Sequence, residues 1–121
     1  MTSKTIMTTA RDFEIFKREF TKYQKLLGLI GIQVYFAHKP LDGDSAQLIM
    51  DYAACTATAC LSSELSEGQE LYKDVKGWGR HEAIHLLLMR LQGEAEYRYA
   101  TKESMLEAVE ETVHRLESVI P

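Results

Sequence analysis

The five residues His81-Glu82-Ala83-Ile84-His85 constrain this chain more than any other stretch of its sequence. On a helix, residues four apart lie on one face about one turn apart, so both imidazoles can reach a single ion. Glu82 projects about 100° further round the helix axis, and from there it can reach a metal-bound water without binding the metal itself. The pattern therefore predicts a helix with a zinc site, because Zn²⁺ accepts imidazole ligands and keeps an open position in catalytic sites.

The residues around the motif bear on the alternative, a chance match in which the histidines merely satisfy a polar pocket. Ala83 and Ile84 are uncharged, and three leucines follow the motif at 86–88. A helix with that pattern is buried on most sides, where unpaired histidines are costly. The flanking residues favour a metal-site helix over a chance match.

Length and composition predict one soluble domain spanning residues 1–121. A net charge of −4 gives no reason to expect a nucleic-acid partner, which requires a basic patch. No apolar run reaches the roughly 18 residues of a membrane span, and the N-terminus lacks the apolar core of a secretory signal. We therefore expect a cytoplasmic protein.

Cys55 and Cys60 should lie on opposite faces of one strand. We expect them to be too far apart to form a disulfide and to act as small buried hydrophobes.

Apolar periodicity predicts an α+β fold with an N-terminal helix, a small three-stranded sheet, the motif helix and a C-terminal helix. Thr9 and Asp12 are expected to cap a helix over residues 10–27, whose apolar stripe is Phe13, Phe16, Phe20, Tyr23 and Leu27. Strands are expected over 32–38, 46–52 and 55–61, the last two joined by a short hairpin. The small side chains of the third strand suit either an edge strand beside a cleft or a strand packed under a helix.

The second half of the chain is expected to be helical. Ser66 is a candidate N-cap, with Tyr72 leading towards the motif helix, which should extend through His85 to Gln92 or Gly93. A loop with Tyr97 and Tyr99 then precedes a last helix over 102–119, with an apolar stripe of Leu106, Val109, Val113, Leu116 and Ile120. His38, beside a turn, is expected to be solvated and without a role.

A catalytic zinc usually has three protein ligands, so the final helix must supply one more. If the last two helices form an antiparallel hairpin, His85 lies about 12 Å before Gly93, and the same distance from Lys102 arrives at Glu110. Glu117 would overshoot by roughly 10 Å. The acidic and histidine side chains that this helix offers as candidates are Glu103, Glu107, Glu110, Glu111, His114 and Glu117.

The direction of the side chains separates the same candidates. Glu110 lies four residues after Leu106 and three before Val113, so it borders the apolar stripe. Glu107, Glu111 and His114 should point to solvent. The alternative is that all these carboxylates form a solvated helix face. We predict Glu110 as the third ligand, because a carboxylate at the edge of the core needs a partner.

With these elements in place, the chain resembles the small zincin-like metallopeptidases found mostly in bacteriophage and prophage genomes. The resemblance runs over nearly the whole chain, and its most specific parts are His-Glu-Ala-Ile-His-Leu-Leu-Leu at 81–88 and Glu-x-x-Val-x-Arg-Leu-Glu at 110–117. By position, the resemblance implies that His81, His85 and Glu110 bind Zn²⁺ and that Glu82 is the general base.

The resulting expectation is a zinc-dependent hydrolase that cleaves a peptide bond in a peptide or protein substrate, in the host cytoplasm if the protein is phage-encoded. The alternative is a zinc-stabilised interaction module without turnover, such as a phage accessory protein that binds a viral or host protein. A fourth protein ligand closing the site would favour that module, and the sequence offers no convincing candidate. No membrane partner is expected in either case.

Overall fold

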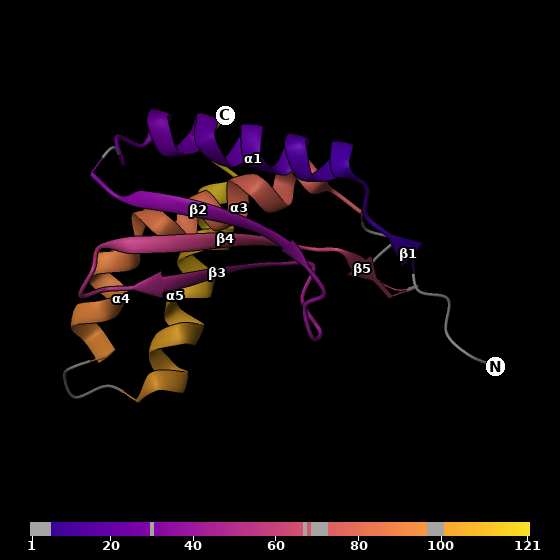
Figure 1. Ribbon diagram of the computed structural model, residues 1–121. Helices are drawn as coiled ribbons and strands as arrows, with labels where there is room; N and C mark the ends of the chain where they lie inside the picture. The colour runs from indigo at the N-terminus through magenta and orange to yellow at the C-terminus, as the bar shows by residue number, and fades with distance from the viewer. Residues whose placement is uncertain (1–5, 30, 67, 69–72, 97–100) are drawn as a thin grey trace.

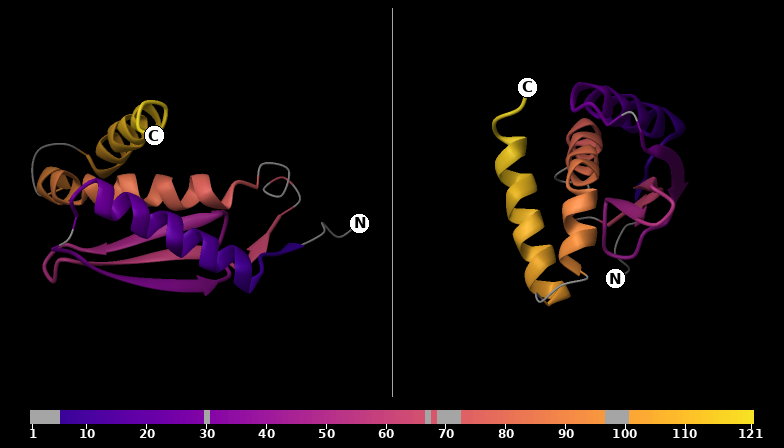
Figure 2. Two further views of the ribbon diagram at one scale, coloured as in Figure 1. Left: turned by 90° about the horizontal axis from the view of Figure 1, so that it is seen from above. Right: turned by 90° about the vertical axis from the view of Figure 1, so that its left-hand side faces the viewer.

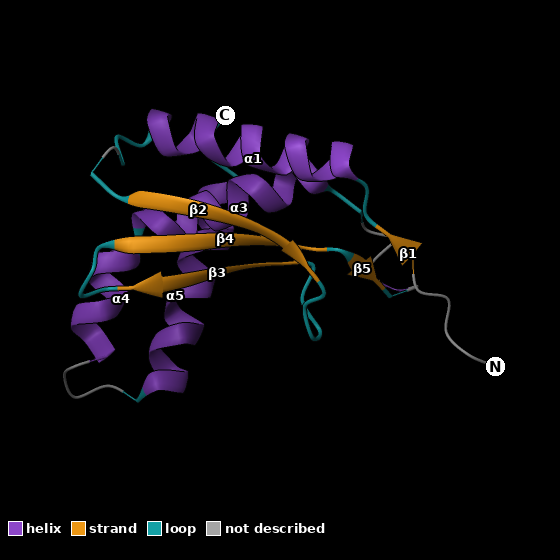
Figure 3. Cartoon of the chain, in the orientation of Figure 1, coloured by secondary structure: helices purple, strands orange, loops and turns teal. Residues whose placement is uncertain are grey.

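The structure, a computed structural model, describes residues 6–29, 31–66, 68, 73–96 and 101–121. It confirms the predicted α+β class, with helices packed on a three-stranded sheet (Figures 1 and 3). The elements in chain order are β1 (Ile6–Met7), α1 (Ala10–Leu26), β2 (Gln33–Lys39), β3 (Ala46–Asp51), β4 (Thr56–Ser62), β5 (Glu64–Leu65), α3 (Val75–Leu87), α4 (Met89–Glu96) and α5 (Lys102–Glu117).

Helix α1 begins as the sequence predicts. Thr9 and Asp12 form a capping box: the Asp12 backbone N–H donates to Thr9 Oγ1 at 3.0 Å, and the Thr9 backbone N–H donates to Asp12 Oδ2 at 2.9 Å. The pair satisfies two of the N–H groups that a helix start leaves free. The buried residues of the helix are Phe16, Phe20 and Tyr23, from the predicted apolar stripe.

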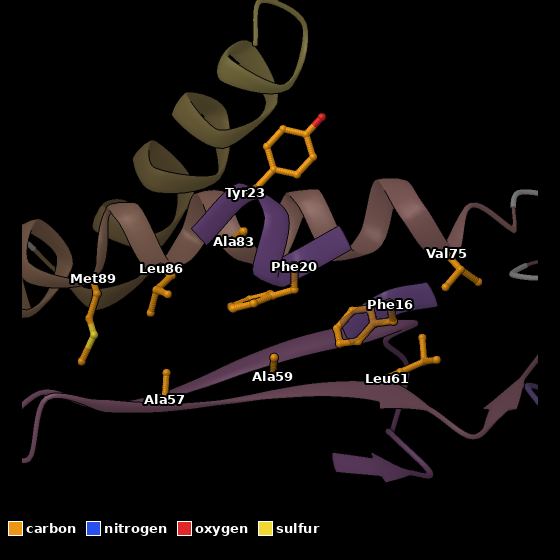
Figure 4. Packing of buried hydrophobic residues seen from close by; sticks show 10 residues of the cluster. All are labelled: Phe16, Phe20, Tyr23, Ala57, Ala59, Leu61, Val75, Ala83, Leu86 and Met89. Atoms are coloured by element: carbon orange, nitrogen blue, oxygen red, sulfur yellow. The ribbon is translucent and has the colours of Figure 1, made fainter. Parts of the chain in front are cut away.

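The main sheet has the strand order β2-β4-β3, with β4 parallel to β2 and antiparallel to β3. The hairpin between β3 and β4 is therefore confirmed, but β4 is the central strand and β3 lies at an edge. The expectation of β4 as an edge strand beside a cleft is wrong. Its small side chains fit the second alternative: Ala57 and Ala59 are fully covered by helices, which approach closely over short side chains (Figure 4).

Helix α3 is the central layer of the molecule. It packs on one face of the sheet beside α1, and α5 lies on its other side (Figure 2). Phe16 and Phe20 of α1 meet Ala83 and Leu86 of α3 over the sheet (Figure 4). Gly79 permits this packing, because a Cβ atom there would lie 2.9 Å from the backbone oxygen of Phe16. Backbone contact with α1 therefore fixes the position of the motif helix.

The motif helix does not continue to Gln92 or Gly93 as predicted, because it ends at Leu87 and α4 starts in a new direction. The backbone N–H of Leu88 donates to His85 O at 3.1 Å as well as to Ile84 O at 3.3 Å, which tightens the last turn. Close tertiary packing accompanies the break, since a Cβ at Gly93 would lie 2.7 Å from the Tyr52 ring. Helix α4 thus packs against the β3–β4 turn and runs beside α5 (Figure 2).

The last helix begins as predicted but ends earlier: Thr101 caps α5, which starts at Lys102 and ends at Glu117 rather than at residue 119. Asp74 caps α3, and its side chain accepts the N–H of Gly77 at 3.0 Å. The prediction of Ser66 as an N-cap concerns the segment that follows it, much of which lies outside the described residues. The predicted positions of Tyr72, Tyr97 and Tyr99 lie outside the described residues. In the described part of the chain, the helices are too short or too polar to cross a membrane.

Two single-residue expectations are wrong. Cys55 is exposed and lies in the turn before β4 with a φ of 56°, so only Cys60 is a buried hydrophobe; both thiols are free, as predicted. His38 is not simply solvated, because its Nε2 lies 2.6 Å from Thr8 Oγ1 and its ring stacks on Phe13. This contact ties the end of β2 to the segment before α1.

Candidate metal centre

His81 and His85 lie one turn apart on the face of α3 that meets α5. Their Nε2 atoms are 3.2 Å apart, and both side chains are largely buried. The spacing places them on one face, and the burial of the neighbouring Ala83 and Leu86 against the sheet fixes which face that is. The two imidazoles therefore converge on one point between the helices.

Glu110 of α5 reaches the same point. Its Oε1 lies 2.9 Å from His81 Nε2, and its Oε2 lies 2.9 Å from His85 Nε2. The side chain is 44% exposed, so it reaches the histidines from the rim of the site. The structure thus brings together the three residues that the sequence analysis selected as ligands.

The donor set fits a zinc ion. One atom from each of the three side chains lies within 4.8 Å of the others. Bonds of 2.0–2.2 Å in a tetrahedral site place donor atoms about 3.3–3.6 Å apart. The two imidazole nitrogens, 3.2 Å apart, are close to this range, and Glu110 Oε1 lies slightly nearer, 2.9 Å from His81 Nε2. Two imidazole nitrogens and one carboxylate leave a tetrahedral ion one position for water or substrate.

Two residues of α5 lie closer to the site than predicted. Glu117 does not overshoot the site: its Oε1 contacts Nδ1 of His81. His114 does not simply point away, since its Nε2 lies 3.4 Å from Glu110 Oε1 and its Nδ1 lies 3.5 Å from Glu117 Oε1. The prediction assumed a straight hairpin, whereas α3 ends at Leu87 and α5 crosses it with about two turns, from Glu110 to Glu117, facing the site (Figure 2).

A signal for these residues was present in the sequence. Glu110, His114 and Glu117 are spaced by four and then three residues, which places them on one helix face. Glu111 lies off this face, as predicted, and pairs with Arg115 at 2.6 Å near solvent. The helical face defined by Glu110 therefore continues to the end of α5.

Glu82 is the buried carboxylate of the site. Its residue is 7% exposed, and burial raises its pKa to about 7; His81 opposes this rise, whereas Glu110, Asp44 and Glu117 add to it. A carboxylate whose pKa lies near neutrality can exchange a proton at neutral pH. The surrounding negative charge also favours a bound cation.

The two motif histidines differ in basicity. Burial lowers the pKa of His81, but the carboxylates of Glu82, Glu117 and Glu110 outweigh burial and raise it overall. Burial is the largest influence on His85 and, with His81 beside it, lowers its pKa despite Glu110. When the His81 ring is neutral and donates its Nδ1–H to Glu117, Nε2 has a free lone pair for a metal ion.

The cluster opens onto a groove of about 470 Å³ between β3, α3 and α5. The groove is lined on one side by His81, Glu82, His85 and Glu110, and on the other by β3 residues, Ala46, Gln47, Leu48 and Met50. Asp44, Gln92 and Leu106 complete the lining. A ligand in this groove would lie beside β3 and the three converging side chains.

Comparison of the chain with models of known protein families, with curated proteins and with solved structures finds no match.

Proposed function

We propose that the protein is a zinc-dependent hydrolase that cleaves peptide bonds. The observation that carries the proposal is the convergence of His81, His85 and Glu110 beside the buried carboxylate of Glu82, in the wall of a groove. Two imidazoles and a carboxylate are a common ligand set for catalytic zinc. A bound zinc ion would supply a Lewis acid that acidifies water and polarises a carbonyl group.

The chain's own residues have distinct tasks in this mechanism. Glu82 takes a proton from the attacking water and later delivers it to the departing amine. Its burial keeps the pKa of the carboxyl close to neutrality, which suits both transfers. Glu117 accepts the Nδ1–H of His81 and so orients the ring with its Nε2 towards Glu110.

The edge strand β3 indicates how a peptide would bind. Within the described residues, β3 pairs only with β4, and the groove runs along residues 46–50 of β3. An extended peptide can add to such an edge through backbone hydrogen bonds. A peptide that pairs with β3 along residues 46–50 would have its scissile carbonyl beside the three converging side chains. Leu48 and Met50 would then provide apolar contacts for substrate side chains.

The test is incubation of the purified protein with a broad peptide library, followed by mass spectrometry of the products. We expect cleavage by the zinc-loaded wild type, loss of cleavage with a chelator, and recovery when zinc is returned. Glu82→Gln should retain zinc, because Glu82 is not a ligand, and lose nearly all cleavage. Wild-type-like turnover in Glu82→Gln would contradict the mechanism. No cleavage by the zinc-loaded wild type would instead support the interaction module without turnover.

A further inference from the structure

We propose a second site for a divalent transition-metal cation on the other side of His81, formed by His114, Glu117 and Nδ1 of His81. Ligand atoms of these three residues all lie within 4.8 Å of one another. Glu117 Oε1 contacts His81 Nδ1 and lies 3.5 Å from His114 Nδ1. Imidazole nitrogens and a carboxylate oxygen are the donors that zinc and similar cations select.

The second site opens onto a second hollow, which shares Ala46, His81 and Glu82 with the lining of the first groove. This hollow of about 380 Å³ lies on this side of His81 and is lined by His114 and Glu117, but not by His85 or Glu110. Trp78 and Asp74 of the α3 N-terminal region form part of its wall. His114 is 64% exposed, so its ring can turn towards an ion without disturbing the core. The hollow therefore offers room for a cation with its remaining ligands supplied by water.

The two sites are coupled because they share His81. A neutral imidazole has one nitrogen without a proton, so His81 can bind an ion through Nδ1 or Nε2 but not through both. When the first site holds zinc through Nε2, a second ion has only His114 and Glu117 and is repelled by the first ion. The second site should thus bind weakly when the first is filled and more tightly when the first is removed.

This coupling is reciprocal. An ion that takes Nδ1 of His81 also takes Glu117 away from its role in orienting that ring. Each ion therefore weakens the binding of the other by the same factor, for which 5- to 150-fold is the typical range between coupled sites. Excess zinc would accordingly weaken the first site.

The test is a titration of the full-length chain with zinc chloride, followed by calorimetry and elemental analysis. Wild type should show one strong and one weak equivalent, and His114→Ala should lose the weak one while it keeps the strong one. The double variant His85→Ala/Glu110→Ala removes the first site. It should still bind one zinc, about 5- to 150-fold more tightly than the weak site of wild type.

The controls use the same double variant. Adding His114→Ala should weaken its remaining zinc by more than the 10- to 100-fold typical of changes outside the ligand set, because a ligand is lost. Adding Glu111→Ala, which lies off this face, should leave it unchanged. Equal zinc binding by the double variant with and without His114→Ala would overturn the second site. If the double variant does not fold, the comparison of wild type with His114→Ala decides whether the weak equivalent of zinc depends on His114. Because the readout is bound zinc, failure of this site is distinguishable from an absence of peptide cleavage.

Discussion

The Nε2 atoms of His81 and His85 lie 3.2 Å apart, close to the separation of two donors on one zinc ion. The rings come from residues one turn apart on α3, so the helix alone sets their spacing. Their common direction depends on tertiary structure, because the backbone contact at Gly79 and the layer formed by α5 decide which way this face points. The local motif and the packing around it agree on one site.

Glu117 should tune zinc affinity without binding the ion of the first site. Its carboxylate contacts His81 Nδ1 and holds the ring with Nε2 towards Glu110. Glu117→Ala should therefore weaken zinc about 10- to 100-fold, the usual effect of losing a hydrogen-bond partner of a ligand, and Glu117→Gln should recover part of the loss. Competition with a chromogenic chelator at substoichiometric zinc measures the affinity. The exposed Glu107→Ala on the same helix is the control, and equal affinities for Glu117→Ala and Glu107→Ala would contradict this role.

The zinc-free protein should lose stability between about pH 4.5 and pH 7 because of Glu82. Burial raises the pKa of this carboxyl from 4.5 to about 7, so the folded protein retains a proton that the unfolded chain has released. Its contribution is fully present below pH 4.5 and is lost as the pH rises through about 7. Relative to Glu82→Gln, which cannot titrate, wild type should lose up to about 3 kcal/mol of unfolding free energy over this interval.

Urea denaturation in the presence of a chelator, at pH 5 and pH 8, measures that difference. Groups that do not interact with Glu82 contribute the same pH dependence to both proteins and cancel in the comparison, so that the difference reports Glu82 together with His81, whose pKa the Glu82 carboxylate raises. Parallel stability curves for wild type and Glu82→Gln would mean that Glu82 is not held in a buried, neutral form.

Gly79 should be required for the packing of the motif helix against α1. A Cβ atom at this position would lie 2.9 Å from the backbone oxygen of Phe16, which cannot move independently of its helix. Gly79→Ala should lower the free energy of unfolding by about 1–3 kcal/mol, although alanine favours helix more than glycine does. Gly31→Ala, where the added Cβ meets nothing within 4 Å, should change stability by less than about 1 kcal/mol. Chemical denaturation of both variants decides the point, and equal stabilities would contradict the close approach.

Local sequence patterns predicted the parts of the fold that depend on local physics. The capping box at Thr9 and the aromatic stripe of α1 both lie within a few turns of one helix, where spacing determines which side chains meet. The β3–β4 hairpin was predictable for the same reason. The position of β4 in the centre of the sheet was not, because β2 pairs with it in parallel across a long connection that leaves no local signal.

The same division applies to the site. The pairing of His81 with His85 follows from the motif. The position of Glu110 beside these histidines was predictable because an approximate antiparallel register is accurate enough for a residue about 12 Å from the start of the helix. The contact of Glu117 with His81 was missed because the register assumed one straight helix, whereas tertiary packing at Gly93 and Tyr52 accompanies the break at Leu88. Glu82 likewise shares its groove with β3, which is distant in sequence.

The most direct test of the metal centre compares zinc affinity in Glu110→Ala and Glu111→Ala, measured side by side by competition with a chromogenic chelator. Glu110 contacts both motif histidines, whereas its neighbour Glu111 pairs with Arg115 near solvent. Loss of a ligand should weaken zinc by more than the 10- to 100-fold typical of changes outside the ligand set, and should lower the thermal stability of the zinc-loaded protein. We predict this loss for Glu110→Ala and wild-type affinity for Glu111→Ala. Equal affinities of the two variants, or a larger loss for Glu111→Ala, would contradict Glu110 as the third ligand.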